Sequence, residues 1–329
     1  MKLVVQIPAL NEAITIQEVI EKIPREIEGV DIVEVVVVDD GSSDKTSELA
    51  KAAGAHVVRH ENPRGVGAAF RSGIEKSGSL GADIICTIDA DMQFNPADIP
   101  KLVMPIASGK ADFATASRFK DAELIPEMPA AKKWGNDFMA RWISAFTKKR
   151  YYDVSCGFRA YSRNAYLRLV LTGEFTYTHE TFLCLAYARV PMLEVPVKVR
   201  GVREHGKSRV ANNLFRYGFR TASIILKTYR DYKPLRFFGY IATFLFILAL
   251  CFLSFLIYWK ITTGGLFPHK WAGFVSGFFA GSALVMVTIG IVAEMLDRMR
   301  VANDEVLFRI RRLEYMLNEK AEETGSDES

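Results

Sequence analysis

Two aspartates separated by one residue form the clearest candidate catalytic pair in the chain. Asp89 and Asp91 follow the apolar run Ile84–Ile88, and residues i and i+2 that leave a strand point to the same side. Both carboxylates can therefore reach one ligand, and carboxylate oxygens suit Mg²⁺ or Mn²⁺, which neutralise a diphosphate leaving group. Gln93 extends this predicted metal and catalytic site. An acidic pair in a turn also arises by chance, so the preceding strand carries much of the argument.

The elements that must position these residues alternate along the chain up to about residue 200. Strand-like runs rich in Val and Ile lie at Leu3–Ile7, Val33–Val38, His56–Arg59, Asp83–Ile88 and Asp112–Ala116. Helix-like stretches lie at about 12–26, 44–53, 66–77 and 97–108. This alternation predicts an α/β fold in which a Rossmann-like, mostly parallel sheet is covered on both faces. Ligands of such sheets bind at the carboxyl ends of the strands.

The segments that follow three of these strands are polar. Residues 8–12 (PALNE) follow the first strand, residues 39–44 (DDGSSD) the second, and residues 89–93 (DADMQ) the fourth. Because the carboxyl ends of parallel strands lie at one edge of a sheet, acidic and turn-forming groups are predicted to converge there.

Together these three segments resemble the signature of glycosyltransferase family 2, whose catalytic domain has the GT-A fold. The resemblance covers residues 1 to about 210 and is to the polyisoprenyl-phosphate glycosyltransferases, which include dolichol-phosphate mannose synthases and undecaprenyl-phosphate glucosyltransferases. It implies an inverting hexosyltransferase that uses a UDP- or GDP-sugar donor and a dolichyl or undecaprenyl phosphate acceptor. It also implies dependence on Mg²⁺ or Mn²⁺.

The resemblance assigns a nucleotide-sugar site to the first two polar segments. Pro8, Leu10 and Glu12 would border the nucleoside. Asp40 would contact the base or the ribose, a role that Asp39 could share.

Two further segments complete the expected donor site. Asp89 would lie by the ribose and diphosphate, with Asp91 on the metal and Gln93 near the reacting phosphates. Arg64 and Gly65 resemble a loop that lies against the donor, and the alternative is an ordinary helix start. Arg203 and Lys207 resemble a basic loop that closes over the diphosphate, and the alternative is a solvated basic loop.

The resemblance also implies an acceptor-phosphate site after the fifth strand. Ser117 and Arg118 match a Ser-Arg pair in which the arginine meets the lipid phosphate, and the planar guanidinium can bind phosphate oxygens bidentately. The other candidates for this site are Lys132 or Lys133, Asn136 and Arg209.

Two later segments are long enough to cross a membrane. Phe237–Trp259 and Trp271–Ala293 contain no charged residue. At ~1.5 Å per residue each reaches about 34 Å, more than a ~30 Å hydrocarbon layer. The short connection between them predicts a transmembrane hairpin over residues 237–295.

Basic residues flank the hairpin on the side of both chain ends. They are Arg216, Arg220, Lys227, Arg230, Lys233 and Arg236 before the first span, and Arg298, Arg300, Arg309, Arg311 and Arg312 after the second. The positive-inside rule therefore predicts a cytosolic catalytic domain (1–210) and cytosolic termini. Residues 211–236 are predicted to form an interfacial amphipathic helix, or alternatively a solvated helix on the catalytic domain. Residues 296–329 are predicted to form a cytosolic helix with a disordered tail from about residue 322.

Two patterns indicate a homo-oligomer, perhaps a tetramer as in some members of the family. Gly273, Gly277 and Gly281 recur on one helix face, and Val306, Ile310, Leu313 and Leu317 form a short heptad stripe. The alternative is that the glycines only pack one span against the other. The net charge of +4 is mild, and we expect no nucleic-acid partner. The rival functions are transfer to a diacylglycerol or a saccharide, and an inactive membrane scaffold.

Overall fold

The structure is a computed structural model that describes residues 1–126, 130–147, 149–171, 177–200, 226–227, 229–231 and 233–327. It divides into two compact units. The first comprises Met1–Asn212 together with Leu307–Ser329, and the second comprises Asn213–Val306. The predicted boundary near residue 210 lies close to the division between Asn212 and Asn213. The last residues of the chain, from Leu307, group with the catalytic unit.

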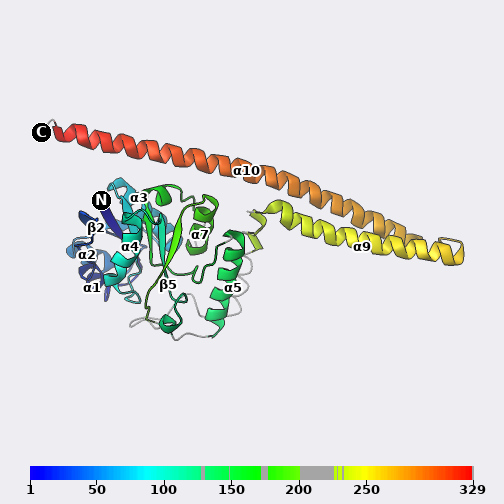
Figure 1. Ribbon diagram of the computed structural model, residues 1–329, viewed down its shortest axis with the longest axis horizontal. Coiled ribbons are helices and arrows are strands. Elements are labelled where there is room, and N and C mark those ends of the chain that lie inside the picture. The colour runs from blue at the N-terminus through cyan, green and yellow to red at the C-terminus, as the bar shows by residue number, and fades with distance from the viewer. Residues whose placement is uncertain are drawn as a thin grey trace. The chain divides into compact units, whose positions relative to one another are not determined.

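The first unit is built on a seven-stranded sheet in the order β3-β2-β1-β4-β6-β5-β7 (Figure 1). The strands are β1 (Lys2–Ala9), β2 (Ile32–Asp39), β3 (His56–Arg59), β4 (Ile84–Thr87), β5 (Phe113–Ser117), β6 (Arg159–Ser162) and β7 (Met192–Pro196). The five strands predicted from the sequence are all present. Strand β6 runs antiparallel to both β4 and β5, whereas the other pairs are parallel.

Helices cover both faces of this sheet. Alternate residues of β1, among them Leu3 and Ile7, pack in one core with α1 (Ile16–Glu21), α2 (Thr46–Ala52) and α4 (Ile99–Ala107), which follows the short η1 (Pro96–Asp98). The opposite face packs against α3 (Val66–Ser79) and α7 (Thr178–Tyr187), through ring contacts such as Phe70 with Tyr161 and Phe113 with Phe182. A side chain at Gly73 of α3 would collide with Gln6 of β1, so glycine permits this close approach.

Three further elements complete the unit, and one expected helix is shorter than predicted. They are η2 (Ala122–Leu124), α5 (Ala130–Thr147) and α6 (Arg163–Leu167). The helix expected at 12–26 is confined to Ile16–Glu21. The backbone N–H groups of Asn11 and Glu12 instead donate to Ser42 Oγ (2.8 Å) and Thr46 Oγ1 (2.9 Å), which holds the start of the segment as a loop.

The second unit contains the two predicted membrane spans. Helix α9 (Pro234–Thr263) and the first part of α10 (Lys270–Asp327) pack together, with Ser276 Oγ donating to the carbonyl of Ala249 (2.8 Å) and Phe252 stacked on Phe279. Only 11% and 17% of the most apolar windows of the two helices are buried. The two helices are therefore mostly exposed, unlike the core helix of a soluble protein, which is mostly buried. Both are candidate membrane spans of a membrane protein.

The end of α10 belongs to the first unit. Arg311 Nη1 donates to the carbonyl of Leu169 (2.7 Å), the ring of Phe308 lies 3.7 Å from the guanidinium carbon of Arg168, and Arg163 donates to the hydroxyl of Tyr315 (2.6 Å). The helix continues to Asp327, so the segment expected to be disordered from about residue 322 is helical instead. Of the predicted interfacial segment, residues 211–225, 228 and 232 lie outside the described residues.

Candidate active site

The polar segments after β1 and β2 are tied together at the carboxyl edge of the sheet. Asn11 has a left-handed backbone (φ 55°), and its side-chain oxygen accepts a hydrogen bond from the backbone N–H of Ser43 (2.8 Å). The predicted donor residues Pro8, Leu10 and Glu12 are half-buried around this junction. The two loops therefore form one rigid border at the place where the nucleoside was predicted to lie.

Asp39 and Asp40 are buried and hold loops in place. Asp39 accepts a hydrogen bond from the backbone N–H of Ser42 (2.8 Å). Asp40 pairs with His60 Nδ1 (2.7 Å) and accepts the backbone N–H groups of Arg64 (2.9 Å) and Gly65 (2.8 Å). Nucleoside contact by either carboxylate stays a prediction.

The loop around Arg64 and Gly65 leads into helix α3, and its contact with the donor stays a prediction. Gly65 is the N-cap of α3, with a φ of 94° that disfavours any residue with a side chain. At the same time Asp40 fixes its backbone at the same edge of the sheet as the other loops. The N-cap geometry thus gives the loop a defined shape beside the predicted donor site.

Asp89 and Asp91 follow β4 on a tight turn. Asp91 is buried, its Oδ1 accepts the backbone N–H of Gln93 (3.1 Å), and Met92 between them has a left-handed backbone (φ 58°). A Cβ at Gly157 would lie 3.2 Å from Asp89 Oδ2, so the glycine leaves room around that carboxylate. The hydroxyl of Tyr177 donates to the carbonyl of Gly157 (3.4 Å) and closes the same corner.

The acidic pair fits a divalent cation that shares its ligands with a substrate. No group of three or more His, Cys, Asp or Glu side chains suited to a metal occurs among the residues that the structure describes. Mg²⁺ is commonly held by one or two carboxylates, with substrate phosphates and water completing its octahedron. Asp89 and Asp91 are therefore the described residues that would hold such a cation, with the remaining ligands left to substrate oxygens and water.

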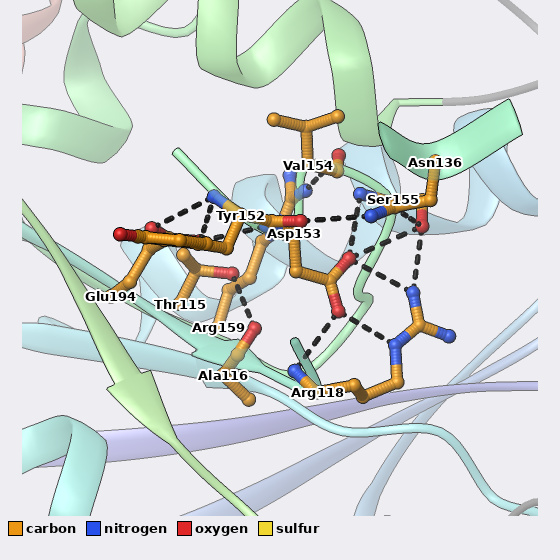
Figure 2. Close-up of polar contacts among 10 residues, drawn as sticks. All are labelled: Thr115, Ala116, Arg118, Asn136, Tyr152, Asp153, Val154, Ser155, Arg159 and Glu194. Carbon is orange, nitrogen blue, oxygen red and sulfur yellow. Dashed lines mark hydrogen bonds and ion pairs between the residues drawn. The ribbon is translucent and has the colours of Figure 1, made fainter. Parts of the chain in front are cut away.

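Arg118 follows β5 and is clamped by a buried aspartate (Figure 2). Its Nε donates to Asp153 Oδ2 (2.6 Å), and its Nη2 donates to Asp153 Oδ1 (2.9 Å) and to Ser155 Oγ (2.7 Å). Burial alone would lower the pKa of Arg118, but the charge and the hydrogen bond of Asp153, with smaller contributions from Cys156 and Asp89, together raise it above its ordinary value. Arg118 is therefore a permanent cation held by Asp153, and Asp89, one of the two predicted metal carboxylates, also stabilises its charge.

The other predicted acceptor residues have different surroundings. Ser117 is fully buried. Both polar groups of the Asn136 side chain are engaged, because Oδ1 accepts from Ser155 Oγ (3.0 Å) and Nδ2 donates to the carbonyl of Tyr152 (2.8 Å). Lys133 is exposed and lines a cavity of about 550 Å³ with Asn136. The side chain of Lys132, and Arg203, Lys207 and Arg209, lie outside the described residues.

Sequence reasoning missed the segment that joins the two halves of the site. Asp153, Ser155 and Gly157 contact Arg118 or Asp89 and precede β6, whose four residues carry no strong strand pattern. Because β6 is antiparallel, the residues that precede it arrive at the edge where the parallel strands end. A short polar Asp-x-Ser-x-Gly segment was the available signal, but its meaning depends on the direction of β6.

Comparison with known proteins agrees with this arrangement. The chain is 29% identical over 214 residues to a UDP-N-acetylglucosamine–dolichyl-phosphate N-acetylglucosaminyltransferase of Methanococcus voltae, which covers 58% of this chain and 83% of that protein. It is 28% identical over 308 residues to an undecaprenyl-phosphate 4-deoxy-4-formamido-L-arabinose transferase of Pseudomonas paraeruginosa, which covers 90% of this chain and 85% of that protein.

A solved structure shares the fold. The glucosyl-3-phosphoglycerate synthase of Mycobacterium tuberculosis, in complex with Mn²⁺, UDP-glucose and phosphoglyceric acid, superposes with a TM-score of 0.52 at 24% identity, over 69% of this chain and 78% of that one. The GT-A fold expected from the sequence is thereby confirmed. The model of the family described as glycosyl transferase family 2 matches residues 4–170. The chain therefore belongs to glycosyl transferase family 2 and is a glycosyltransferase.

Proposed function

We propose that this enzyme transfers a hexose, with inversion, from a UDP- or GDP-sugar to the phosphate of a polyisoprenyl lipid. The observation that carries the proposal is that Arg118, whose guanidinium can bind an anion, is held by Asp153 and Ser155, in the same short segment whose Gly157 lies against the Asp89 carboxylate. Both curated relatives described above are named for transfer to a dolichyl or undecaprenyl phosphate. The two candidate membrane spans suit an acceptor that resides in a lipid bilayer.

The reaction is a displacement at C1 of the sugar. A phosphate oxygen of the lipid forms the new bond to C1, and the bond from C1 to the donor diphosphate breaks, with its electron pair leaving on the nucleoside diphosphate. A phosphate monoester has its second pKa near ~6, so this nucleophile is already anionic at pH 7 and no side chain has to accept a proton. The protein therefore acts by positioning and by charge.

Each part of the site has one task in this scheme. The loops at 8–12 and 60–65 border the donor, and Arg118 orients the acceptor phosphate. Asp89 and Asp91 would hold Mg²⁺ or Mn²⁺, which neutralises the leaving diphosphate when bound. The solved synthase that shares the fold was crystallised with Mn²⁺ and UDP-glucose, which supports a divalent cation at this place.

The acceptor class is tested by direct competition between lipids. The full-length protein in detergent is offered undecaprenyl phosphate, dolichyl phosphate or diacylglycerol with radiolabelled UDP- and GDP-sugars. Product on a polyprenyl phosphate alone supports the proposal. Product on diacylglycerol would replace it with the rival lipid acceptor, and donor hydrolysis without any transfer would still exclude an inactive scaffold.

The membrane topology is proposed from the basic flanks of the hairpin. A reporter fused to the C-terminus is expected in the cytosol, and one inserted at Gly264-Gly265, in the connection between the helices, on the far side. Detection of both reporters on the same side of the membrane would exclude the hairpin. A catalytic domain on the far side would also remove access to cytosolic nucleotide-sugars.

A further inference from the structure

All N–H groups on the Nε and Nη2 side of the Arg118 guanidinium donate hydrogen bonds within the protein. Nε–H and one N–H of Nη2 point to the two carboxylate oxygens of Asp153, and the second N–H of Nη2 points to Ser155. The ring of Phe119 lies 5.2 Å from the guanidinium carbon. Of the three guanidinium nitrogens of Arg118, only Nη1 has no hydrogen-bond partner among the residues that the structure describes. A phosphate can therefore be met end-on by Nη1, not by the bidentate fork expected from the sequence.

Asp153 is itself held rigidly from the neighbouring strand. Its carboxylate is fully buried, and its backbone N–H donates to Glu194 Oε1 of β7 (2.8 Å). The backbone N–H of Arg118 also donates to Asp153 Oδ2 (3.1 Å), so the same carboxylate fixes both the main chain and the side chain of the arginine.

Ser155 and Asn136 extend this network to helix α5. Ser155 Oγ accepts from Arg118 and lies 3.0 Å from Asn136 Oδ1, while Asn136 Nδ2 donates to the carbonyl of Tyr152. Helix α5 is thereby connected to Arg118 through a single hydroxyl (Figure 2). An arginine held in this way loses little freedom when it binds a phosphate, because its rotamer is already set.

We propose that Asp153 is a positioning residue that, with Ser155, aims Nη1 of Arg118 at the acceptor phosphate. The inference rests on the proposed function, since it requires a phosphate acceptor. It makes Asp153 neither a base nor a metal ligand, because both carboxylate oxygens are committed to Arg118. Without the Asp153 carboxylate, the guanidinium of Arg118 keeps its charge, but its orientation toward the acceptor phosphate is no longer fixed.

A double-mutant cycle between Asp153 and Arg118 tests whether Asp153 acts by positioning Arg118 or by a separate effect on the protein. Asp153→Asn in the full-length protein is expected to raise the KM for undecaprenyl phosphate about tenfold and to lower kcat, with the donor KM unchanged within about twofold. In an Arg118→Ala background the same substitution is expected to change neither constant further. A residue that acted on the substrate independently of Arg118 would give additive losses.

Asp83→Asn is the matched control. Asp83 also pairs with an arginine, Arg163, but it precedes β4 and therefore lies at the opposite edge of the sheet. This variant loses an aspartate–arginine ion pair from the same unit and is expected to keep the wild-type KM for the lipid. A similar rise in KM in the control would assign the effect to general loosening and overturn the proposal.

Ser155→Ala keeps the test decisive if Asp153→Asn does not fold. Folding is checked by the thermal stabilisation that the nucleotide-sugar confers on the protein. Ser155→Ala leaves the ion pair intact and is expected to raise the lipid KM about threefold, again only when Arg118 is present. Additive effects in either cycle overturn the positioning role alone, whereas a wild type that does not glycosylate undecaprenyl or dolichyl phosphate overturns the proposed function and the inference with it.

Discussion

The catalytic unit and the helical hairpin use the same apolar residue types in opposite surroundings. Leu3, Ile7 and Leu102 of the catalytic unit are fully buried, whereas Phe274 and Leu284 of the hairpin are 80% and 69% exposed. In water, an exposed face of this size would drive association or aggregation. In a bilayer it has no such cost, because lipid tails are as apolar as the side chains themselves. The contrast therefore separates a unit that folds against its own core from one whose exposed apolar surface suits a lipid environment.

The largest expected effect is the loss of turnover when a predicted metal ligand in the catalytic unit is replaced. Asp91→Asn is expected to reduce turnover by at least about a thousandfold, since removal of a group that stabilises transition-state charge has effects of this order. The measurement is transfer of radiolabelled sugar to polyprenyl phosphate, with Asp98→Asn, a carboxylate on η1 paired with Lys101, as the control. Membrane insertion should be unchanged in both variants. Full wild-type turnover in excess chelator would remove the metal role.

A charge on an exposed apolar position discriminates between water and lipid. Leu284→Arg near the middle of the second span is expected to cost about 3 kcal/mol of membrane insertion. Ile14→Arg, at a position 74% exposed on the catalytic unit, is expected to alter stability by less than about 0.5 kcal/mol. An insertion assay for the first variant and thermal unfolding for the second measure the two effects. Equal tolerance of both changes would mean that the hairpin is not in lipid.

The pH dependence is expected to follow the acceptor and not the enzyme. Activity should fall about tenfold per pH unit below about pH 6, as the lipid phosphate takes up its second proton, and vary little between about pH 6.5 and 8. Burial would raise the pKa of Asp153, but Arg118 lowers it below its usual range. The stability contributed by this pair is therefore present above the unfolded pKa of about 4 and is lost only as the pH falls through the lower folded value.

Glu194 is the carboxylate that needs a control in this experiment. Its pKa is raised by burial, so protonation in mild acid is easier in the folded than in the unfolded protein and does not weaken folding. Glu194→Gln should therefore leave the pH–rate profile in place. A profile that shifts in this variant, or that an external base restores, would indicate an enzyme carboxylate in the rate step and a hydroxyl acceptor.

The smallest expected effect concerns association of the hairpin with a second copy, which we propose from its glycine face. A side chain at Gly273 would meet Leu256 of the first span at 3.1 Å, so this glycine packs the two spans together. Gly277 and Gly281 have no atom within 4 Å of an added Cβ, and this part of the face is open within the described residues. Gly277→Ile with Gly281→Ile is expected to shift the protein toward monomer in light scattering, with turnover largely retained. A wild type that is already monomeric before and after removal of residues 303–329 would contradict the proposal.

The agreement between sequence and structure is best where periodicity alone carries the signal. The runs Leu3–Ile7 and Val33–Val38 became the central parallel strands, and the uncharged segments became α9 and α10. The expected helix at 12–26 was wrong at both ends: the backbone N–H of Glu12 donates to Thr46 at the start of α2, and the helix spans only Ile16–Glu21. The expectation that Arg118 binds phosphate bidentately did not include Asp153, whose carboxylate already accepts from Nε and Nη2 of the arginine.

The sequence by itself determined the class of sheet, the Asp89–Asp91 pair and the hairpin, because side-chain alternation, strand-end polarity and uninterrupted hydrophobicity are all local properties. Only the tertiary structure decided how Arg118 is presented. Asp153 lies 35 residues away along the chain and reaches the arginine because β6 enters the sheet antiparallel between β4 and β5. Such a contact depends on strand order and direction, which are set by the packing of the whole sheet.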